Sequence, residues 1–280
     1  MAVFVDTRIN LNVSTMVFIL LLVFISTPSV MAKDLIFATP PTQSPEATLK
    51  NYQPLVDYLS QTIGQTIVID PAHNYQEYTK KMREGLYDIV LDGAHFIKWR
   101  IEKQHHVVIA KQPGDLHFVV VVKKNSKFKD MKDLWTKPIC SPPVPHIGPL
   151  TLLALYNNPI REPVIVPVDS FKSGLECLKK GNGVAVLLRD KYWVNAVKDK
   201  SNLRVLYVTT RKLPARGLTV SPHISVTAQK KITEALTSAK GREYTEKAFS
   251  TVGGGKFVRA DTKEFDSLEE VIQLVWGFNL

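Results

Sequence analysis

Short runs of apolar residues alternate along this chain with segments whose apolar residues recur every three or four positions. Runs rich in β-branched and aromatic residues, bounded by turn-forming residues, predict strands. The predicted strands are 35–39, 65–70, 87–93, 106–111, 117–124, 137–140, 163–168, 183–190 and 203–209. Helical patterns lie between them, and this alternation of strand and helix is typical of α/β proteins.

The helical patterns place apolar residues on one face of each predicted helix. The face that runs from Leu49 to Ile63 predicts a helix, and Pro54 lies inside it. Because proline has no N–H, this helix is expected to begin near Pro54 or to be kinked there. The spacing also predicts a helix over 171–178 and a closing helix over 268–275.

The four consecutive valines at 119–122 predict a strand that is buried on both faces. They lie near the middle of the chain. If this strand leads into a second α/β unit and residues 215–221 lead back, the chain forms two lobes joined by two crossovers. We therefore predict lobe 1 from residues 33–119 plus 222–280 and lobe 2 from 120–221. A hinge is expected near 120–123 and 218–221.

The N-terminal segment has the pattern of a secretory signal peptide. The apolar core from Met16 to Ile25 follows Arg8, and small residues precede the expected cleavage near Ala32. An uncleaved anchor is the alternative, but the apolar run is shorter than the roughly 20 residues that span a bilayer. We expect residues 1–32 to be a signal peptide and the mature protein to be exported.

The formal net charge is +10. A basic surface favours an anionic ligand, an anionic surface or an acidic partner. The lysines are scattered singly and in pairs rather than gathered in one tract, so nucleic-acid binding is not expected.

The chain contains two cysteines, Cys140 and Cys177. After export to an oxidising compartment they can pair. Alternatively, both are small buried apolar residues, since one ends a predicted strand and the other lies in a predicted helix. The sequence does not supply the Cα separation that decides between the two.

Four segments carry a resemblance to a known family through their order and spacing. They are 52–69 (YQPLVDYLSQTIGQTIVI), 87–99 (YDIVLDGAHFIKW), 117–134 (HFVVVVKKNSKFKDMKDL) and 170–187 (SFKSGLECLKKGNGVAVL). Over nearly all its mature length the chain resembles the phosphate/phosphite/phosphonate (PhnD-like) periplasmic solute-binding proteins of ABC transporters.

The resemblance implies an α/β, two-lobed periplasmic binding protein of type II-like fold, with a small-molecule ligand in the cleft between lobes and delivery to an ABC permease. It implies a periplasmic monomer that is not an enzyme and needs no cofactor. The alternative is a sensor or carrier that hands a larger, partly apolar, lipid-like ligand to another inner-membrane partner. For an enzyme, Asp92, Asp169 and His146 are the only plausible catalytic trio.

The chain departs from the family at the segments that hold the ligand. The family's junction corresponding to 141–148 is rich in Ser and Thr, but here three prolines follow Ser141. The family's Ser-His pair at the start of the next helix is Ser170-Phe171 here. Both changes remove hydrogen-bond donors that a desolvated phosphate needs. The expected ligand is therefore not a simple phosphonate.

Ligands of open α/β sheets bind outside the carboxyl ends of the strands. This rule selects the candidate ligand-binding residues Thr39, Thr42, Gln43, Asp92, Gly93, Ala94, His95, Ser141, His146, Asp169, Ser170, Phe171, Arg189 and Tyr192.

Several candidates also have a purely structural interpretation. The segment 92–95 is either a binding loop or an ordinary turn with Asp92 as a helix cap. Arg189 either forms a surface ion pair with Asp190 or holds a ligand carboxylate in a forked contact. Phe171 is the best candidate for an apolar wall of the site, although aromatic residues more often belong to the core. No metal site is expected, because the histidines lack a metal-binding spacing.

Overall fold

The computed structural model describes residues 1, 3, 33–156, 158–210, 213–248 and 255–268. Asp34–Leu280 is a compact unit separate from Met1–Lys33. The predicted signal peptide lies almost entirely outside the described residues, as does the predicted closing helix beyond Leu268.

A six-stranded sheet forms from segments near both ends of the described chain, in the order β13-β4-β12-β3-β1-β2. The strands are β1 (Leu35–Ala38), β2 (Ile67–Ile69), β3 (Ile89–Asp92), β4 (Val107–Lys111), β12 (Gly217–Val220) and β13 (Val258–Arg259). β1 pairs in parallel with β2 and β3. β12 runs antiparallel between β3 and β4, so a late segment of the chain completes the sheet that the first strands begin.

A five-stranded sheet forms from the middle of the chain, in the order β10-β6-β9-β7-β8. Its strands are β6 (Phe118–Lys123), β7 (Pro138–Ser141), β8 (Val164–Pro167), β9 (Ala185–Arg189) and β10 (Leu203–Val208). β6 pairs antiparallel with β9 and β10. The prediction of a buried strand at 119–122 is confirmed, because these four valines are at most 4% exposed.

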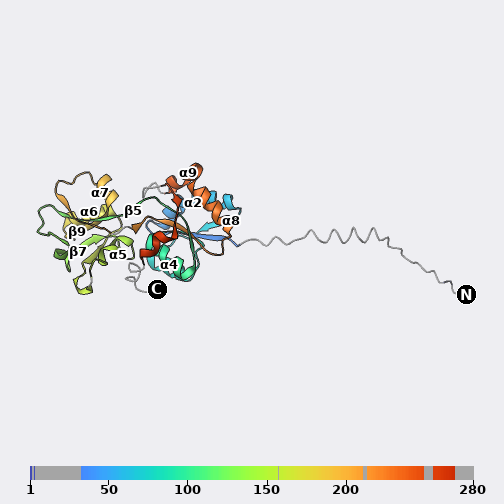
Figure 1. The fold of residues 1–280 in the computed structure, drawn as a ribbon, viewed down its shortest axis with the longest axis horizontal. Coiled ribbons are helices and arrows are strands. Elements are labelled where there is room, and N and C mark those ends of the chain that lie inside the picture. The colour runs from blue at the N-terminus through green and yellow to red at the C-terminus, as the bar shows by residue number, and fades with distance from the viewer. Residues whose placement is uncertain (2, 4–32, 157, 211–212, 249–254, 269–280) are drawn as a thin grey trace. The chain divides into compact units, whose positions relative to one another are not determined.

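Helices flank each sheet (Figure 1). Those that accompany the six-stranded sheet are α2 (Pro45–Ile63), α3 (Tyr75–Arg83), α4 (Ala94–Gln104), α8 (Val226–Thr237), α9 (Ala239–Ala248) and the 3₁₀ segment η4 (Thr262–Leu268). Those that accompany the five-stranded sheet are η2 (Met131–Leu134), α5 (Ile147–Leu153), η3 (Pro159–Arg161), α6 (Phe171–Lys180) and α7 (Asp190–Asn195).

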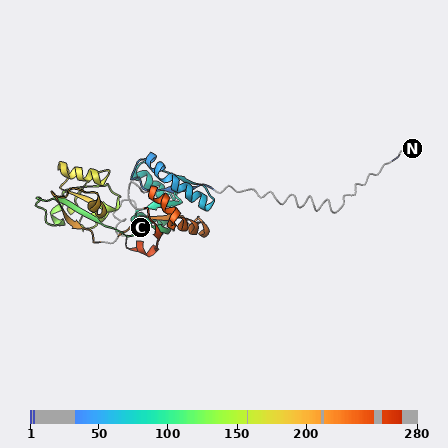
Figure 2. The same cartoon turned by 90° about the horizontal axis from the view of Figure 1, so that it is seen from above.

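Helix α2 differs from its prediction. Ser44 caps it, and its hydroxyl accepts a hydrogen bond from the Ala47 backbone N–H. Of the two alternatives, a start near Pro54 is wrong, because Pro54 lies inside a helix that is capped at Ser44, and a kink at Pro54 stays a prediction. α2 packs against α8 and α9, and Figure 2 shows the blue helix beside the orange ones. The predicted helix over 171–178 is confirmed as α6.

The two crossovers between the sheets pair with each other. β5 (Asp115–Leu116) precedes β6, and β11 (Leu213–Pro214) precedes β12; the two short strands run antiparallel. The predicted hinge positions, 120–123 and 218–221, fall on β6 and β12, which are hydrogen-bonded inside the two sheets, and a hinge there stays a prediction. The segments that connect the two sheets contain β5 and β11.

The sheet membership of β12 also differs from the predicted lobe boundary. The predicted lobe 2 spans 120–221, but Gly217–Val220 pairs with β3 and β4 in the six-stranded sheet. The sequence pattern of residues 215–221 (ARGLTVS) is too short to distinguish a connecting segment from a strand. The division of the chain into lobes stays a prediction, with its return crossover moved toward β11.

Cys140 and Cys177 form a disulfide, with their Cα atoms 6.2 Å apart. Cys140 lies in β7 and Cys177 in α6, and both are buried among the valines and leucines of the five-stranded sheet. Of the two alternatives left open by the sequence, the structure has the bonded one, and the bond ties a strand to the helix that covers it.

Candidate functional site

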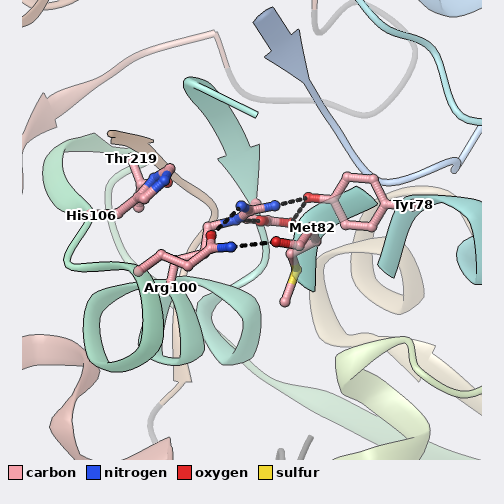
Figure 3. Close-up of polar contacts among 7 residues, drawn as sticks. Tyr78, Met82, Arg100, His106 and Thr219 are labelled. Carbon is pink, nitrogen blue, oxygen red and sulfur yellow. Dashed lines mark hydrogen bonds and ion pairs between the residues drawn. The ribbon is translucent and has the colours of Figure 1, made fainter. Parts of the chain in front are cut away.

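A buried polar network holds the end of β3 (Figure 3). One oxygen of Asp92 accepts a hydrogen bond from Arg100 Nε at 2.8 Å, and the other accepts from the Tyr78 hydroxyl at 2.7 Å. Burial raises the pKa of the Tyr78 phenol well above its usual value, so it stays a donor. Both carboxylate oxygens of Asp92 therefore have protein partners, and the network ties α3 and α4 to the strand.

His95 lies in the first turn of α4, just beyond this network. Its side chain is buried, and Nε2 lies 2.9 Å from the carbonyl oxygen of Pro145. The other ring nitrogen, Nδ1, is buried without a hydrogen-bond partner. Burial, followed by the charge of His146, lowers the pKa of His95 to about 3, so the ring is neutral at physiological pH.

His146 joins a group of aromatic rings. Its Nδ1 accepts a hydrogen bond from the Gly148 backbone N–H at 3.0 Å, which caps α5. The ring meets Phe118 and Phe171 edge to face, with centroids 6.1 and 6.3 Å away, and Phe171 in turn contacts Tyr192 at 5.4 Å. Three of the predicted site residues, His146, Phe171 and Tyr192, thus form one apolar surface.

Two arginines lie within electrostatic range of this surface. Arg189 ends β9, and its Nε atom is buried without a hydrogen-bond partner. Burial lowers the pKa of Arg189, and the positive charge of Arg216 lowers it further, although Asp190 opposes both. The charges of Arg216 and Arg189 also help burial to lower the pKa of His146 to about 4.

Arg216 lies between β11 and β12 and was not predicted as a site residue. Its charge also reaches Asp92 and Tyr75, whose phenol has its pKa raised to about 12 by burial. The sequence contained one signal that points to Arg216, a cation on the return crossover. Residues 215–221 are predicted only as a connection between lobes, and for this reason Arg216 is not selected.

Thr39 directly follows β1 and is buried, and its hydroxyl has no hydrogen-bond partner. Among the described residues, four buried side-chain atoms lack a partner, and three of them belong to predicted site residues: Thr39 Oγ1, His95 Nδ1 and Arg189 Nε. The fourth is Tyr87 Oη. Because buried polar atoms in folded proteins are nearly always bonded, these three atoms point to a ligand.

The other predicted residues have local roles or lie in solvent. Thr42 and Asp169 are exposed, Ala94 is buried in the core, and Gly93 precedes α4. The side chain of Gln43 accepts a hydrogen bond from Asn51, and the Ser141 hydroxyl donates one to the carbonyl oxygen of Pro142. Ser170 caps α6. The structure thus places His146, Phe171 and Tyr192 in one group of ring contacts, and His95 and Arg189 lie within electrostatic range of His146. Gln43, Ser141 and Ser170 have ordinary local contacts.

The sequence matches a protein-family model over residues 37–265, and the chain belongs to that family, described as the ABC transporter, phosphonate, periplasmic substrate-binding protein family. Members of this family bind small molecules and work with ABC permeases. The family serves transport rather than catalysis. No curated protein matches the chain.

Solved structures of low sequence identity share the fold. PhnD1 from Prochlorococcus marinus, solved with methylphosphonate, is 17% identical and has a TM-score of 0.67, covering 86% of this chain and 98% of that one. XAC2383 from Xanthomonas citri, solved with ATP, is 14% identical with a TM-score of 0.69, covering 85% and 95%. A phosphonate-transporter binding protein from Pseudomonas aeruginosa is 14% identical with a TM-score of 0.61, covering 86% and 85%.

These similarities confirm the predicted α/β, two-lobed periplasmic binding protein fold. The described helices include none with the length and apolar character that a bilayer crossing requires.

Proposed function

We propose that this protein is an exported, monomeric solute-binding protein that binds an acidic, partly apolar small molecule between its two lobes and delivers it to an ABC permease. The observation that carries the proposal is the pair Arg189 and Arg216. Each cation lies within electrostatic range of the other, and Arg189 Nε is buried without a partner.

An acidic group satisfies this pair in the simplest way. Two neighbouring guanidinium groups repel each other, and a buried donor without an acceptor costs about 1–3 kcal/mol. A carboxylate or phosphate accepts several N–H groups of arginine at once in a forked contact. Binding of an anion therefore removes the repulsion and fills the unused donor.

The aromatic surface supports a ligand with an apolar part. Phe118, His146, Phe171 and Tyr192 form a continuous set of ring contacts. Phe171 stands where the family has a histidine donor, and prolines stand where it has Ser and Thr. These replacements exchange hydrogen-bonding groups for apolar surface and disfavour a bare phosphate or a small phosphonate. A carrier of a lipid-like acid is the second candidate, supported by the same rings.

The three residues that made a catalytic alternative plausible have other roles. Asp92 is bonded to Arg100 and Tyr78, Asp169 is exposed, and His146 Nδ1 caps α5. A nucleophile with an adjacent base is the minimum for hydrolytic chemistry. The contacts of these residues favour binding without catalysis.

Mass spectrometry of molecules that copurify with the protein from the periplasm tests the proposal. The expected result is an organic acid with an apolar portion, released on denaturation and absent from an Arg189→Gln, Arg216→Gln double variant. Recovery of a cation or an uncharged sugar from the native protein contradicts the acidic class. Recovery of a fatty acid or lysolipid favours the carrier over the importer.

A further inference from the structure

The tautomer of His95 is determined by its partner. The partner is the carbonyl oxygen of Pro145, which accepts hydrogen bonds and cannot donate them. Nε2, at 2.9 Å, therefore carries the hydrogen and donates it to Pro145. Because the low pKa of His95 keeps the ring neutral, Nδ1 bears a lone pair and no hydrogen.

This lone pair meets no donor among the residues that the structure describes. The His95 side chain is 3% exposed, and Nδ1 is buried without a hydrogen-bond partner. An acceptor in this position, taken out of water and left unpaired, is unfavourable. The Thr39 hydroxyl, another buried group without a partner, can both donate and accept, whereas His95 Nδ1 can only accept.

Gly93 lies beside the Nδ1 edge of the ring and places no side chain against it. A Cβ atom at position 93 would stand 3.0 Å from His95 Cε1 and 3.2 Å from Nδ1. The φ of Gly93 is −72°, a value that other residues adopt readily, so its backbone conformation does not require glycine. A side chain at position 93 would therefore occupy the space beside Nδ1.

We propose that the ligand carries a hydroxyl or amine N–H that donates to His95 Nδ1, in addition to the acidic group that meets the arginines. This proposal rests on the proposed function, which assigns the acid to Arg189 and Arg216. The ligand class is then a hydroxy or amino acid with an apolar part. A fully deprotonated oxyanion alone presents only acceptors, so it would face the Nδ1 lone pair without forming a bond.

Isothermal titration of the purified, ligand-stripped protein with isosteric acids tests the proposal. The pairs are glycolate with propionate, and mandelate with 2-phenylpropionate, each differing by a hydroxyl in place of a methyl group. We expect the hydroxylated member to bind about tenfold more tightly or better, the effect of one hydrogen bond to a buried acceptor. Equal affinities within both pairs would overturn the proposal.

Two variants locate the preference at Nδ1. Gly93→Ala keeps the His95 side chain but places a methyl group against its Nδ1 edge, and His95→Phe removes the acceptor. In both variants, the ratio of the affinity for the hydroxylated acid to that for its methyl counterpart should fall toward one. If both variants keep the ratio of the parent protein, the proposal is contradicted. Arg189→Gln is the matched control, because it should weaken both members of a pair equally and leave their ratio unchanged.

The control also separates the two claims, namely that the arginines bind the acid and that His95 Nδ1 accepts from a ligand donor. If both members bind with the expected preference but Arg189→Gln and Arg216→Gln have no effect, the donor contact stands and the assignment of the acid is wrong. If acids bind in an arginine-dependent way without any preference, the proposed function stands and the donor contact is wrong. If no acid binds, both fail.

A measurement on the unmodified protein keeps the test independent of folding defects in the variants. In long-range ¹H–¹⁵N spectra, unprotonated and protonated ring nitrogens of histidine are well separated. Saturation with mandelate should move the His95 Nδ1 resonance toward the protonated range while Nε2 stays protonated, and 2-phenylpropionate should not produce this movement. An unchanged Nδ1 resonance with mandelate bound would contradict the contact.

Discussion

Cys140 is bonded to Cys177, so the strand that ends at Ser141 is covalently attached to the helix that begins at Phe171. The bond closes a sequence separation of 37 residues. It therefore links the proline-rich junction after β7 to the helix that carries Phe171, one of the rings of the candidate site.

Removal of this disulfide should lower stability substantially. For a loop of this length, chain entropy predicts that the Cys140→Ser, Cys177→Ser variant loses about 3–4 kcal/mol of unfolding free energy. Urea denaturation of the variant beside the oxidised parent measures the loss. Equal midpoints for the two proteins would show that the bond does not constrain the native chain in solution.

The Asp92–Arg100 pair should be far more sensitive than a surface pair. Both side chains are fully buried, and Asp92→Ala leaves the guanidinium without its partner. We expect a loss of about 3–5 kcal/mol. Glu176→Ala is the matched control, since its contact with Lys179 is exposed and should be worth about 1 kcal/mol or less. Similar losses for the two variants would refute a structural role for Asp92.

Three histidines with lowered pKa values predict acid sensitivity. Burial is the main cause that lowers the pKa of His95 and His106 to about 3 and that of His146 to about 4. In the unfolded chain these groups titrate near 6.5. The unfolded state therefore binds more protons below this pH, and stability that is fully present above about 6.5 falls as the pH approaches 4.

Denaturation at a series of pH values measures this effect. Each histidine that is protonated only in the unfolded state contributes a slope of up to about 1.4 kcal/mol per pH unit. His106→Asn removes one of the three and should flatten the profile between pH 6 and 4. A stability that is constant over this range in the parent protein contradicts the neutral state of these rings.

The sequence predicted much of the fold because its signals are local. β-branched runs such as 119–122 appear in the structure as buried strands, and the Phe171–Leu178 periodicity appears as α6. The start of α2 was missed because a capped helix tolerates Pro54. The pairing of β12 with β3 and β4 depends on partners more than a hundred positions away, which no local pattern encodes.

The candidate site was predictable in part for a related reason. The strand-end rule selected Thr39, His95 and Arg189, all of which have a buried polar atom without a partner. It also selected Asp92, since the rule does not reveal that Arg100 lies 2.8 Å from its carboxylate. Arg216 is not among the predicted site residues, because its position depends on the crossover between the two sheets.

The protein should bind phosphonates weakly, and restoring hydrogen-bond donors should raise this affinity. The three prolines after Ser141, and Phe171, replace donors that a tetrahedral oxyanion requires. Isothermal titration should show weak or no binding of phosphate, phosphite and methylphosphonate to the parent protein. The Pro143→Ser, Phe171→His double variant should gain affinity for methylphosphonate. Sub-micromolar binding to the parent would contradict this account, and no gain in the variant would show that these positions do not line the site.

The central claim is that Arg189 and Arg216 hold the acidic group of the ligand. Its most direct test is titration of the acid identified from the periplasm into the parent protein and into Arg189→Gln, Arg216→Gln and Lys179→Gln variants. Loss of one charged forked contact predicts at least about tenfold weaker binding in each arginine variant. The exposed Lys179→Gln control should match the parent. Parent-like affinity in both arginine variants would contradict the claim.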